Sequence, residues 1–203
     1  MIGRCIVIGA GSLDPAVIPE KRPGDFVIAA DGGMRYLKAA GITPDYFIGD
    51  LDSEETAPET DRTILPVRKD DTDTVAACRY GLQKGYRSFL ILGGLGGDRF
   101  SHSAANVQLL SWLKNQGAEG MLSDEKTEIR LLRNENVTLE EGRHRFFSLF
   151  ALSETSKVTV KNALFFGEHL RLSSDFPLGV SNEIQKGTEI RVEEGDVLLV
   201  IDG

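Results

Sequence analysis

The stretch Tyr46-Phe47-Ile48-Gly49-Asp50-Leu51-Asp52-Ser53 joins a short apolar run to two aspartates that one residue separates. The apolar run is typical of a β-strand, and side chains at positions i and i+2 of an extended chain point the same way. We therefore expect Asp50 and Asp52 to project together from a strand end. Carboxylates so close repel each other unless a cation joins them, and Mg²⁺ favours such oxygens and usually binds phosphates as well. The alternative is an ordinary polar turn, for which Gly, Asp and Ser are common residues.

Several apolar runs on either side of this stretch also end in turn residues. Strand-like runs cover residues 4–8, 26–30, 64–67 and 88–92, and helical patterns cover 34–40 and 75–82, with a longer one that follows residues 98–103 and continues to about 116. Strands that alternate with helices predict a mostly parallel sheet with right-handed crossovers. We therefore predict a Rossmann-like α/β domain over residues 1–133. In such a fold the turns that follow the strands lie along one rim of the sheet, where ligands bind.

The next acidic cluster is Lys69-Asp70-Asp71-Thr72-Asp73, just before a helical pattern. Asp71 or Thr72 suits the helix N-cap, and the dipole favours an acidic residue in the first turn. Three aspartates exceed what a cap needs, and the free N–H groups of a helix start bind phosphate. Two acidic turns in neighbouring units therefore favour a metal site over plain turns.

Two more turns carry candidate residues. Residues 93–97 contain four glycines, which allow a ligand close to the backbone, and Arg99 follows with donors that suit a phosphate. The alternative for these glycines is a flexible loop. His102 is more typical of a helix start than of a catalyst. Asp31 follows the second strand and is either a helix N-cap or a carboxylate that faces a ligand.

After about Asn134 the pattern changes to short alternating runs without an amphipathic helix, such as residues 157–161 and 188–193. This pattern predicts an antiparallel all-β sandwich over residues 134–203. Within it, Ser181 and Asn182 form a polar segment that is either a turn or a functional loop. We expect Phe165-Phe166 and Phe176 to pack inside the sandwich rather than to face a flat ligand.

The composition limits the possible partners. The chain has 203 residues and a net charge of -8, which disfavours nucleic acid or an anionic membrane as a partner. The two cysteines, Cys5 and Cys78, lack the spacing of a metal or redox motif, so we expect buried thiols. No apolar run resembles a membrane span or a secretory signal, and we expect a cytoplasmic protein.

Taken together and in this order, these stretches resemble the thiamine pyrophosphokinase family. The stretches that carry the resemblance are residues 30–33, 44–45 with 49–53, 69–73, 93–106 and 181–183. The resemblance implies an N-terminal α/β domain, a C-terminal β-sandwich, and a homodimer with the active site at the subunit interface. It also implies that the chain transfers the diphosphate of ATP to thiamine, with Mg²⁺, to give thiamine diphosphate and AMP.

The resemblance further implies roles for individual residues. Asp50, Asp52 and Asp73 match the carboxylates that hold Mg²⁺. Asp31 lies at the reacting end of the site, where Asp31 or Asp73 is expected to orient or deprotonate the thiamine hydroxyl. The expected nucleotide-side residues are Lys69, Asp70, Thr72, Arg99, Ser101 and His102. Ser181 and Asn182 match the segment that contacts thiamine.

One position departs from the family pattern. Many relatives read Arg-x-Asp-His where this chain reads Arg99-Phe100-Ser101-His102, with an additional Asp98 before the arginine. Either Asp98 supplies the missing carboxylate or the role is dispensable. The C-terminal half has no tryptophan to stack on thiamine, so the aromatic partner is unassigned. The alternatives in function are a kinase or pyrophosphokinase for another alcohol, and a non-catalytic module that binds a nucleotide or thiamine.

Overall fold

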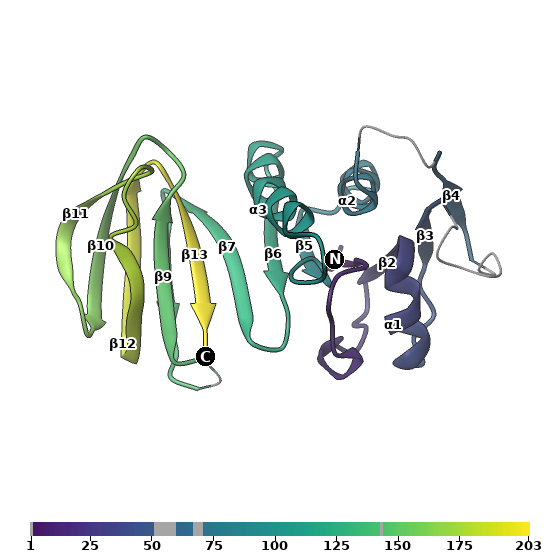
Figure 1. Ribbon diagram of the computed structural model, residues 1–203, viewed down its shortest axis with the longest axis horizontal. Helices are drawn as coiled ribbons and strands as arrows, with labels where there is room; N and C mark the ends of the chain where they lie inside the picture. The colour runs from purple at the N-terminus through teal and green to yellow at the C-terminus, as the bar shows by residue number, and fades with distance from the viewer. Residues whose placement is uncertain (1, 51–59, 67–70, 143) are drawn as a thin grey trace. The chain divides into compact units, whose positions relative to one another are not determined.

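The computed structural model of the chain describes residues 2–50, 60–66, 71–142 and 144–203. Contacts divide the chain into two compact units, residues 1–125 and 126–203 (Figure 1). The first unit alternates strands with helices and short 3₁₀ turns, and the second consists of strands, which gives a mixed α/β fold. The elements of the first unit are β1 (Cys5–Ile8), η1 (Pro15–Val17), β2 (Phe26–Ala30), η2 (Asp31–Gly33), α1 (Met34–Ala39), β3 (Tyr46–Gly49), β4 (Arg62–Ile64), α2 (Asp73–Gln83), β5 (Ser88–Leu92), α3 (Phe100–Asn115) and β6 (Glu119–Ser123).

The sheet of the first unit has the strand order β6-β5-β1-β2-β3-β4, and every pair in it is parallel. All four residues of β1 are buried, as are the last four of β2 and of β5. Their nearly continuous apolar sequences follow from this burial, because helices cover both faces of such a sheet.

The helices of the first unit divide between the two faces of its sheet. Leu37 of α1 shares a core cluster with Ile6, Ile8 and Ala29, which point to one face. Gly81 of α2 lies against Cys5 and Phe89, which point to the other face. Helix α3 packs on β6 and α2. Gly41 and Gly117 follow α1 and α3 with φ of +69° and +70°, the left-handed conformation in which many helices end.

All strand pairs within the second unit are antiparallel. One sheet has the order β12-β9-β13-β7 and the other β11-β10-β12-β8, because the long strand β12 contributes its first part to one sheet and its second part to the other. The strands of this unit are β7 (Thr127–Arg133), β8 (Asn136–Leu139), β9 (Phe146–Ala151), β10 (Thr155–Ala163), β11 (Gly167–Ser173), β12 (Gly179–Glu194) and β13 (Asp196–Asp202).

Both sheets of the second unit contribute to one hydrophobic core. Phe147 and Leu199 come from one sheet, and Val158, Ile190 and Val192 come from the other. The alternating sequences at residues 157–161 and 188–193 thus point their apolar members inward, as predicted. No helix occurs among the described residues of this unit.

Two predicted boundaries differ from the structure. The predicted division at residue 133 falls eight residues later than the observed one at residue 125. The reason is β7, which pairs along its whole length with β13, while Leu132 joins the core of the second unit. The predicted strand at residues 64–67 is instead β4, Arg62–Ile64, which continues the parallel register from β3.

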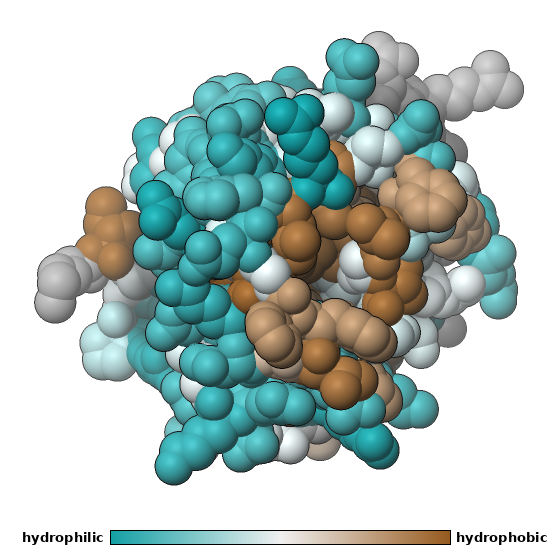
Figure 2. Space-filling view, turned by 90° about the vertical axis from the view of Figure 1, so that its left-hand side faces the viewer, coloured by the Kyte–Doolittle hydropathy of each residue, from teal (hydrophilic) through white to brown (hydrophobic). Residues whose placement is uncertain are grey.

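The prediction that three phenylalanines pack inside the sandwich is wrong. Phe165, Phe166 and Phe176 are 67%, 74% and 65% exposed, respectively. Hydrophobic side chains gather on the surface seen in Figure 2. We use "apolar face" for the exposed hydrophobic residues of the β10–β11 and β11–β12 connections and the start of β12: Leu164, Phe165, Phe166, Phe176, Leu178 and Val180.

Two further expectations concern the cysteines and the membrane. Cys5 and Cys78 are buried free thiols, as predicted. Burial is also the main cause that raises the pKa of the Cys5 thiol, with a smaller contribution from the Asp45 carboxylate. Among the helices that the structure describes, none combines the length and the apolar character needed to cross a bilayer.

Candidate active site

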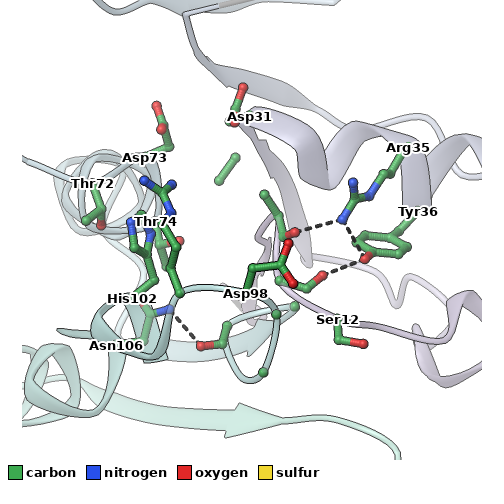
Figure 3. Close-up of a pocket in the computed structure, with 18 of the residues that line it drawn as sticks. Ser12, Asp31, Arg35, Tyr36, Thr72, Asp73, Thr74, Asp98, His102 and Asn106 are labelled. Carbon is green, nitrogen blue, oxygen red and sulfur yellow. Dashed lines mark hydrogen bonds between the residues drawn. The ribbon is translucent and has the colours of Figure 1, made fainter. Parts of the chain in front are cut away.

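A cavity of about 820 Å³ lies in the first unit at the carboxyl ends of β1, β2, β3 and β5 (Figure 3). Residues from the turns after all four strands line it, among them Gly11, Asp31, Asp50 and Gly94. Parallel strands bring their carboxyl ends to one rim, and this confirms the expectation that the acidic and glycine-rich turns meet there.

Two glycine-rich turns, after β1 and after β5, are in direct contact. The Gly9 N–H donates to Leu92 O at 2.7 Å, and the Gly11 N–H donates to Gly93 O at 2.8 Å. A Cβ atom on Gly11 would lie 2.6 Å from Gly93 O. The glycines are therefore needed for the close approach of the two backbones, which together form this part of the cavity wall.

Asp31 follows β2 directly and has a left-handed backbone, with φ of +48°. A non-glycine residue in that region costs of order 1–3 kcal/mol, and such strain often occurs at functional sites. Gly49 of β3 packs against the Asp31 backbone, where a Cβ atom would lie 2.9 Å from Asp31 Cα. Of the two predicted roles, the helix N-cap does not apply, because the N-cap of α1 is Gly33. Asp31 lines the cavity instead.

The start of α2 forms another part of the cavity wall. Thr72 is the N-cap, with its Oγ1 accepting the Val75 N–H at 3.3 Å, and Asp73 is the first helical residue. Asp71, the other predicted cap, forms an ion pair with Arg79 at 2.9 Å. The cavity is thus bordered by the Thr72 hydroxyl and the Asp73 carboxylate at one helix start.

The start of α3 contributes Arg99, the N-cap residue, and His102, and both line the cavity. Asp98 lines it as well, whereas Ser101 is exposed and does not. The Asp98 carboxylate, next to Arg99 in sequence, therefore lies at the cavity wall, and the Ser101 side chain does not.

Three predicted residues, Asp52, Lys69 and Asp70, lie outside the described residues. Two others, Ser181 and Asn182, belong to the second unit. The Ser181 side chain is exposed, and its backbone N–H donates to Ser148 Oγ at 3.0 Å. The Asn182 side chain accepts from the Phe165 N–H at 2.9 Å and donates to Phe165 O at 2.6 Å. Its amide is thus already engaged in holding the segment that carries Phe165.

Among the polar residues that line the cavity without having been predicted as site residues are Ser12, Arg35, Tyr36 and Asn106. Asn106 is buried, and its Nδ2 donates to Gly94 O at 2.8 Å, which fixes the glycine-rich turn. Its spacing from Leu109, Leu110 and Leu113, which places a polar residue on the buried face of α3, is the signal that could have identified it. Arg35 and Tyr36 follow Gly32-Gly33 in a short helix whose sequence pattern does not reveal which residues face the rim.

The carboxylates of the cavity suit a hard divalent ion. Asp50 and Asp73 both line it, and Mg²⁺ is usually held by one or two carboxylates together with phosphate oxygens and waters. Within the described ranges, no three His, Cys, Asp or Glu side chains cluster tightly enough to hold a metal by themselves. The two described carboxylates therefore fit Mg²⁺ that arrives with phosphate oxygens and waters.

Comparisons with known proteins give one family. The sequence profile for the catalytic domain of thiamin pyrophosphokinase matches residues 22–122, about half of the chain. The structure is similar to that of thiamine pyrophosphokinase from Bacillus subtilis, with a TM-score of 0.88 and 21% identity over 98% of this chain and 99% of that one. It is also similar to thiamin pyrophosphokinase from Geobacillus thermodenitrificans, with a TM-score of 0.85 and 22% identity over 99% of this chain and 98% of that one. For thiamin pyrophosphokinase from Candida albicans the TM-score is 0.79, with 14% identity over 98% of this chain and 88% of that one. No curated protein matches the chain by sequence.

Proposed function

Because the chain belongs to the thiamin pyrophosphokinase family and is thus a thiamine diphosphokinase, we propose that it transfers the diphosphate of ATP to thiamine in a magnesium-dependent reaction. The products are thiamine diphosphate and AMP. The observation that carries the proposal is the rim cavity, which combines the carboxylates Asp31, Asp50 and Asp73 with Arg99 and the start of α2. A cavity with both kinds of group suits a metal-bound polyphosphate better than a neutral ligand.

In the proposed reaction the hydroxyl oxygen of thiamine forms a bond to the β-phosphorus of ATP. The bond between that phosphorus and the oxygen bridging to the α-phosphate breaks, and AMP leaves. The hydroxyl proton passes to Asp31 or Asp73, both of which line the cavity. Negative charge builds on the phosphate oxygens, so positioning and electrostatic stabilisation supply most of the rate.

The other residues take roles according to their place. Asp50 and Asp73, together with Asp52, would hold Mg²⁺, which when bound neutralises charge on the diphosphate. Thr72, Arg99 and His102 border the cavity and would bind the phosphates, and Lys69, Asp70 and Ser101 are the further nucleotide-side residues of the proposal. The start of α2 at Asp73 lies beside the cavity, and a helix N-terminus favours the same anion.

We propose that the second unit is a β-sandwich that supplies the thiamine contacts. Ser181 would contact thiamine with its exposed hydroxyl, while the engaged amide of Asn182 keeps the neighbouring Phe165 segment in place. We also propose a homodimer with the active site at the subunit interface. The exposed phenylalanines of the apolar face support this, since large exposed hydrophobic patches mark interaction surfaces.

The proposal predicts that turnover needs thiamine, ATP and Mg²⁺ together. Replacing Asp73 with Asn should lower kcat/KM by at least ~10²-fold, because one preorganised electrostatic group is lost. Steady-state assays with and without EDTA measure both effects. The matched control is Asp61→Asn, which removes an exposed carboxylate directly before β4, outside the cavity lining, and should leave turnover unchanged. Metal-independent turnover, or wild-type turnover in Asp73→Asn, would contradict the proposed site.

A further inference from the structure

Arg35 of α1 lies on the cavity wall opposite Thr72, Asp73 and His102 (Figure 3). Its Nη2 donates to Ala10 O and to Tyr36 Oη, each at 2.8 Å. An arginine has five N–H donors. The two contacts use Nη2, so Nε and Nη1 are left for an acceptor in the cavity.

The guanidinium of Arg35 is held in place before any ligand binds. Its Cζ lies 4.6 Å from the centroid of the Tyr36 ring, within the range of a cation–π contact. The Tyr36 hydroxyl in turn donates to Gly11 O at 2.5 Å. Since Gly11 bonds to Gly93, the brace connects α1 to both glycine-rich turns. A cation fixed in this way loses little conformational entropy when it binds an anion.

The residues that line the cavity carry more negative than positive charge. Five carboxylates line it: Asp31, Asp50, Asp71, Asp73 and Asp98. The described lining residues include two arginines, Arg35 and Arg99, and no lysine. Asp71 pairs with Arg79, but Arg35 takes part in no ion pair with any described residue. An exposed, unneutralised guanidinium that faces a cavity is suited to an anionic ligand.

We propose that Arg35 is an anion-binding residue of this site in addition to Arg99, and that it holds a phosphate group of the nucleotide on the wall opposite Thr72 and His102. The inference rests on the proposed function only in that the ligand is a nucleotide polyphosphate. The phosphate contact would come from α1, whose Arg35 is bonded to Ala10 O in the turn after β1. With Arg35 and Arg99 both in the cavity lining, the phosphate chain would be held at two points along its length.

Titration calorimetry with AMP, inorganic diphosphate and ATP, at fixed Mg²⁺ and without thiamine, tests the proposal. Arg35→Gln keeps a donor for Ala10 O but removes the charge, and it should weaken binding of at least one of the three ligands roughly tenfold or more, the range for a hydrogen bond to a charged group. The dependence of its Kd on salt should also be weaker than in the wild type. Arg35→Lys should regain part of the affinity and of the salt dependence.

Arg87→Gln is the matched control, since Arg87 donates only to the carbonyls of Leu82 and Tyr86 and lies outside the cavity lining. Its affinities should equal those of the wild type. If Arg35→Gln binds all three ligands within twofold of the wild type, Arg35 holds no phosphate. If Arg35→Lys is as weak as Arg35→Gln and neither changes the salt dependence, Arg35 only braces the turn and the proposal is overturned. A wild-type protein that binds none of the ligands would overturn the proposed function together with this inference.

Discussion

Asp25 shows how strongly one side chain outside the active site can hold the first unit together. Its side chain is 2% exposed, and its carboxylate accepts from Arg4 Nη2 at 2.7 Å, from the Arg4 N–H at 2.8 Å and from the Arg22 N–H at 3.2 Å. Burial by itself would raise the pKa of the Asp25 carboxyl. The hydrogen bonds from Arg4 and Arg22 outweigh burial and lower this pKa from 3.8 to about 2.

The lowered pKa of Asp25 predicts a loss of stability in acid. A carboxyl with a lowered folded-state pKa contributes stability that is complete above its unfolded-state pKa, near 4, and is lost as the pH falls through about 2. Asp25→Asn should therefore lower the free energy of unfolding by about 2 kcal/mol at pH 7, and the difference from the wild type should shrink between pH 4 and 2. Urea unfolding at several pH values measures it. A difference that stays constant over this range would show that ionisation of Asp25 is not the cause.

Some site residues could be predicted from the sequence and others could not. Asp31, Asp50, Thr72, Asp73 and Arg99 directly follow strand ends or begin helices, where position along the chain determines position on the rim. Arg35 has no such marker, because its place depends on how a short helix packs beside the turn after β1. Ser101, in the first turn of α3, is exposed and lies outside the cavity lining, and the sequence does not show which residues of that turn face the rim.

At the scale of elements, the start of α2 carries both structure and a proposed function. Thr72 caps the helix through the Val75 N–H, and replacing an N-cap threonine by alanine typically costs about 1 kcal/mol. Thr72→Ala should therefore expose the Val75 amide to faster hydrogen exchange, whereas Thr72→Ser keeps the hydroxyl and should exchange as the wild type does. Exchange measured by NMR separates these cases. Equal protection in the alanine and serine variants would mean that the cap contributes nothing.

The contact between η2 and β1 depends on one glycine. A Cβ atom on Gly33 would lie 1.9 Å from Ile8 O and 2.6 Å from Ile8 C, so the backbone must move to admit it. Gly33→Ala should lower the free energy of unfolding by at least about 3 kcal/mol, at the upper end for overpacked sites. Gly142→Ala is the control, because a Cβ atom there would have no neighbour within 4 Å. Denaturant unfolding compares the two, and similar stabilities would disprove the steric argument.

The elements themselves were predictable to different degrees. The strands Cys5–Ile8 and Ser88–Leu92 could be predicted because helices cover both faces of the sheet. Burial on both faces requires a nearly continuous apolar sequence, which is visible in the chain. The three residues of β4 are exposed or half-buried, so they have no such pattern, and the prediction placed that strand too late. The exposure of Phe165 and Phe166 could not be seen either, because an apolar residue in a connection has no periodicity to indicate which way it points.

At the scale of the whole molecule, the change from alternating helices and strands to strands alone indicated the class of fold. That change in pattern did not indicate the residue at which the first unit ends and the second begins. Strand β7 comes directly after the parallel strands of the first unit in sequence, yet it pairs with β13, more than sixty residues later in the chain. The Arg133 guanidinium forms an ion pair with Asp196 at 2.5 Å in the same strand pair. Only a long-range pairing of this kind assigns residues 126–133 to the second unit.

The transfer of a diphosphate as one group is the central claim, and following the β-phosphorus of ATP tests it most directly. The purified protein is incubated with thiamine, Mg²⁺ and ATP labelled at the β-phosphorus, and the products are separated and counted. The proposed reaction predicts that the label appears in thiamine diphosphate and that an equal amount of unlabelled AMP forms. Label retained in ADP, with thiamine monophosphate as the other product, would contradict the claim.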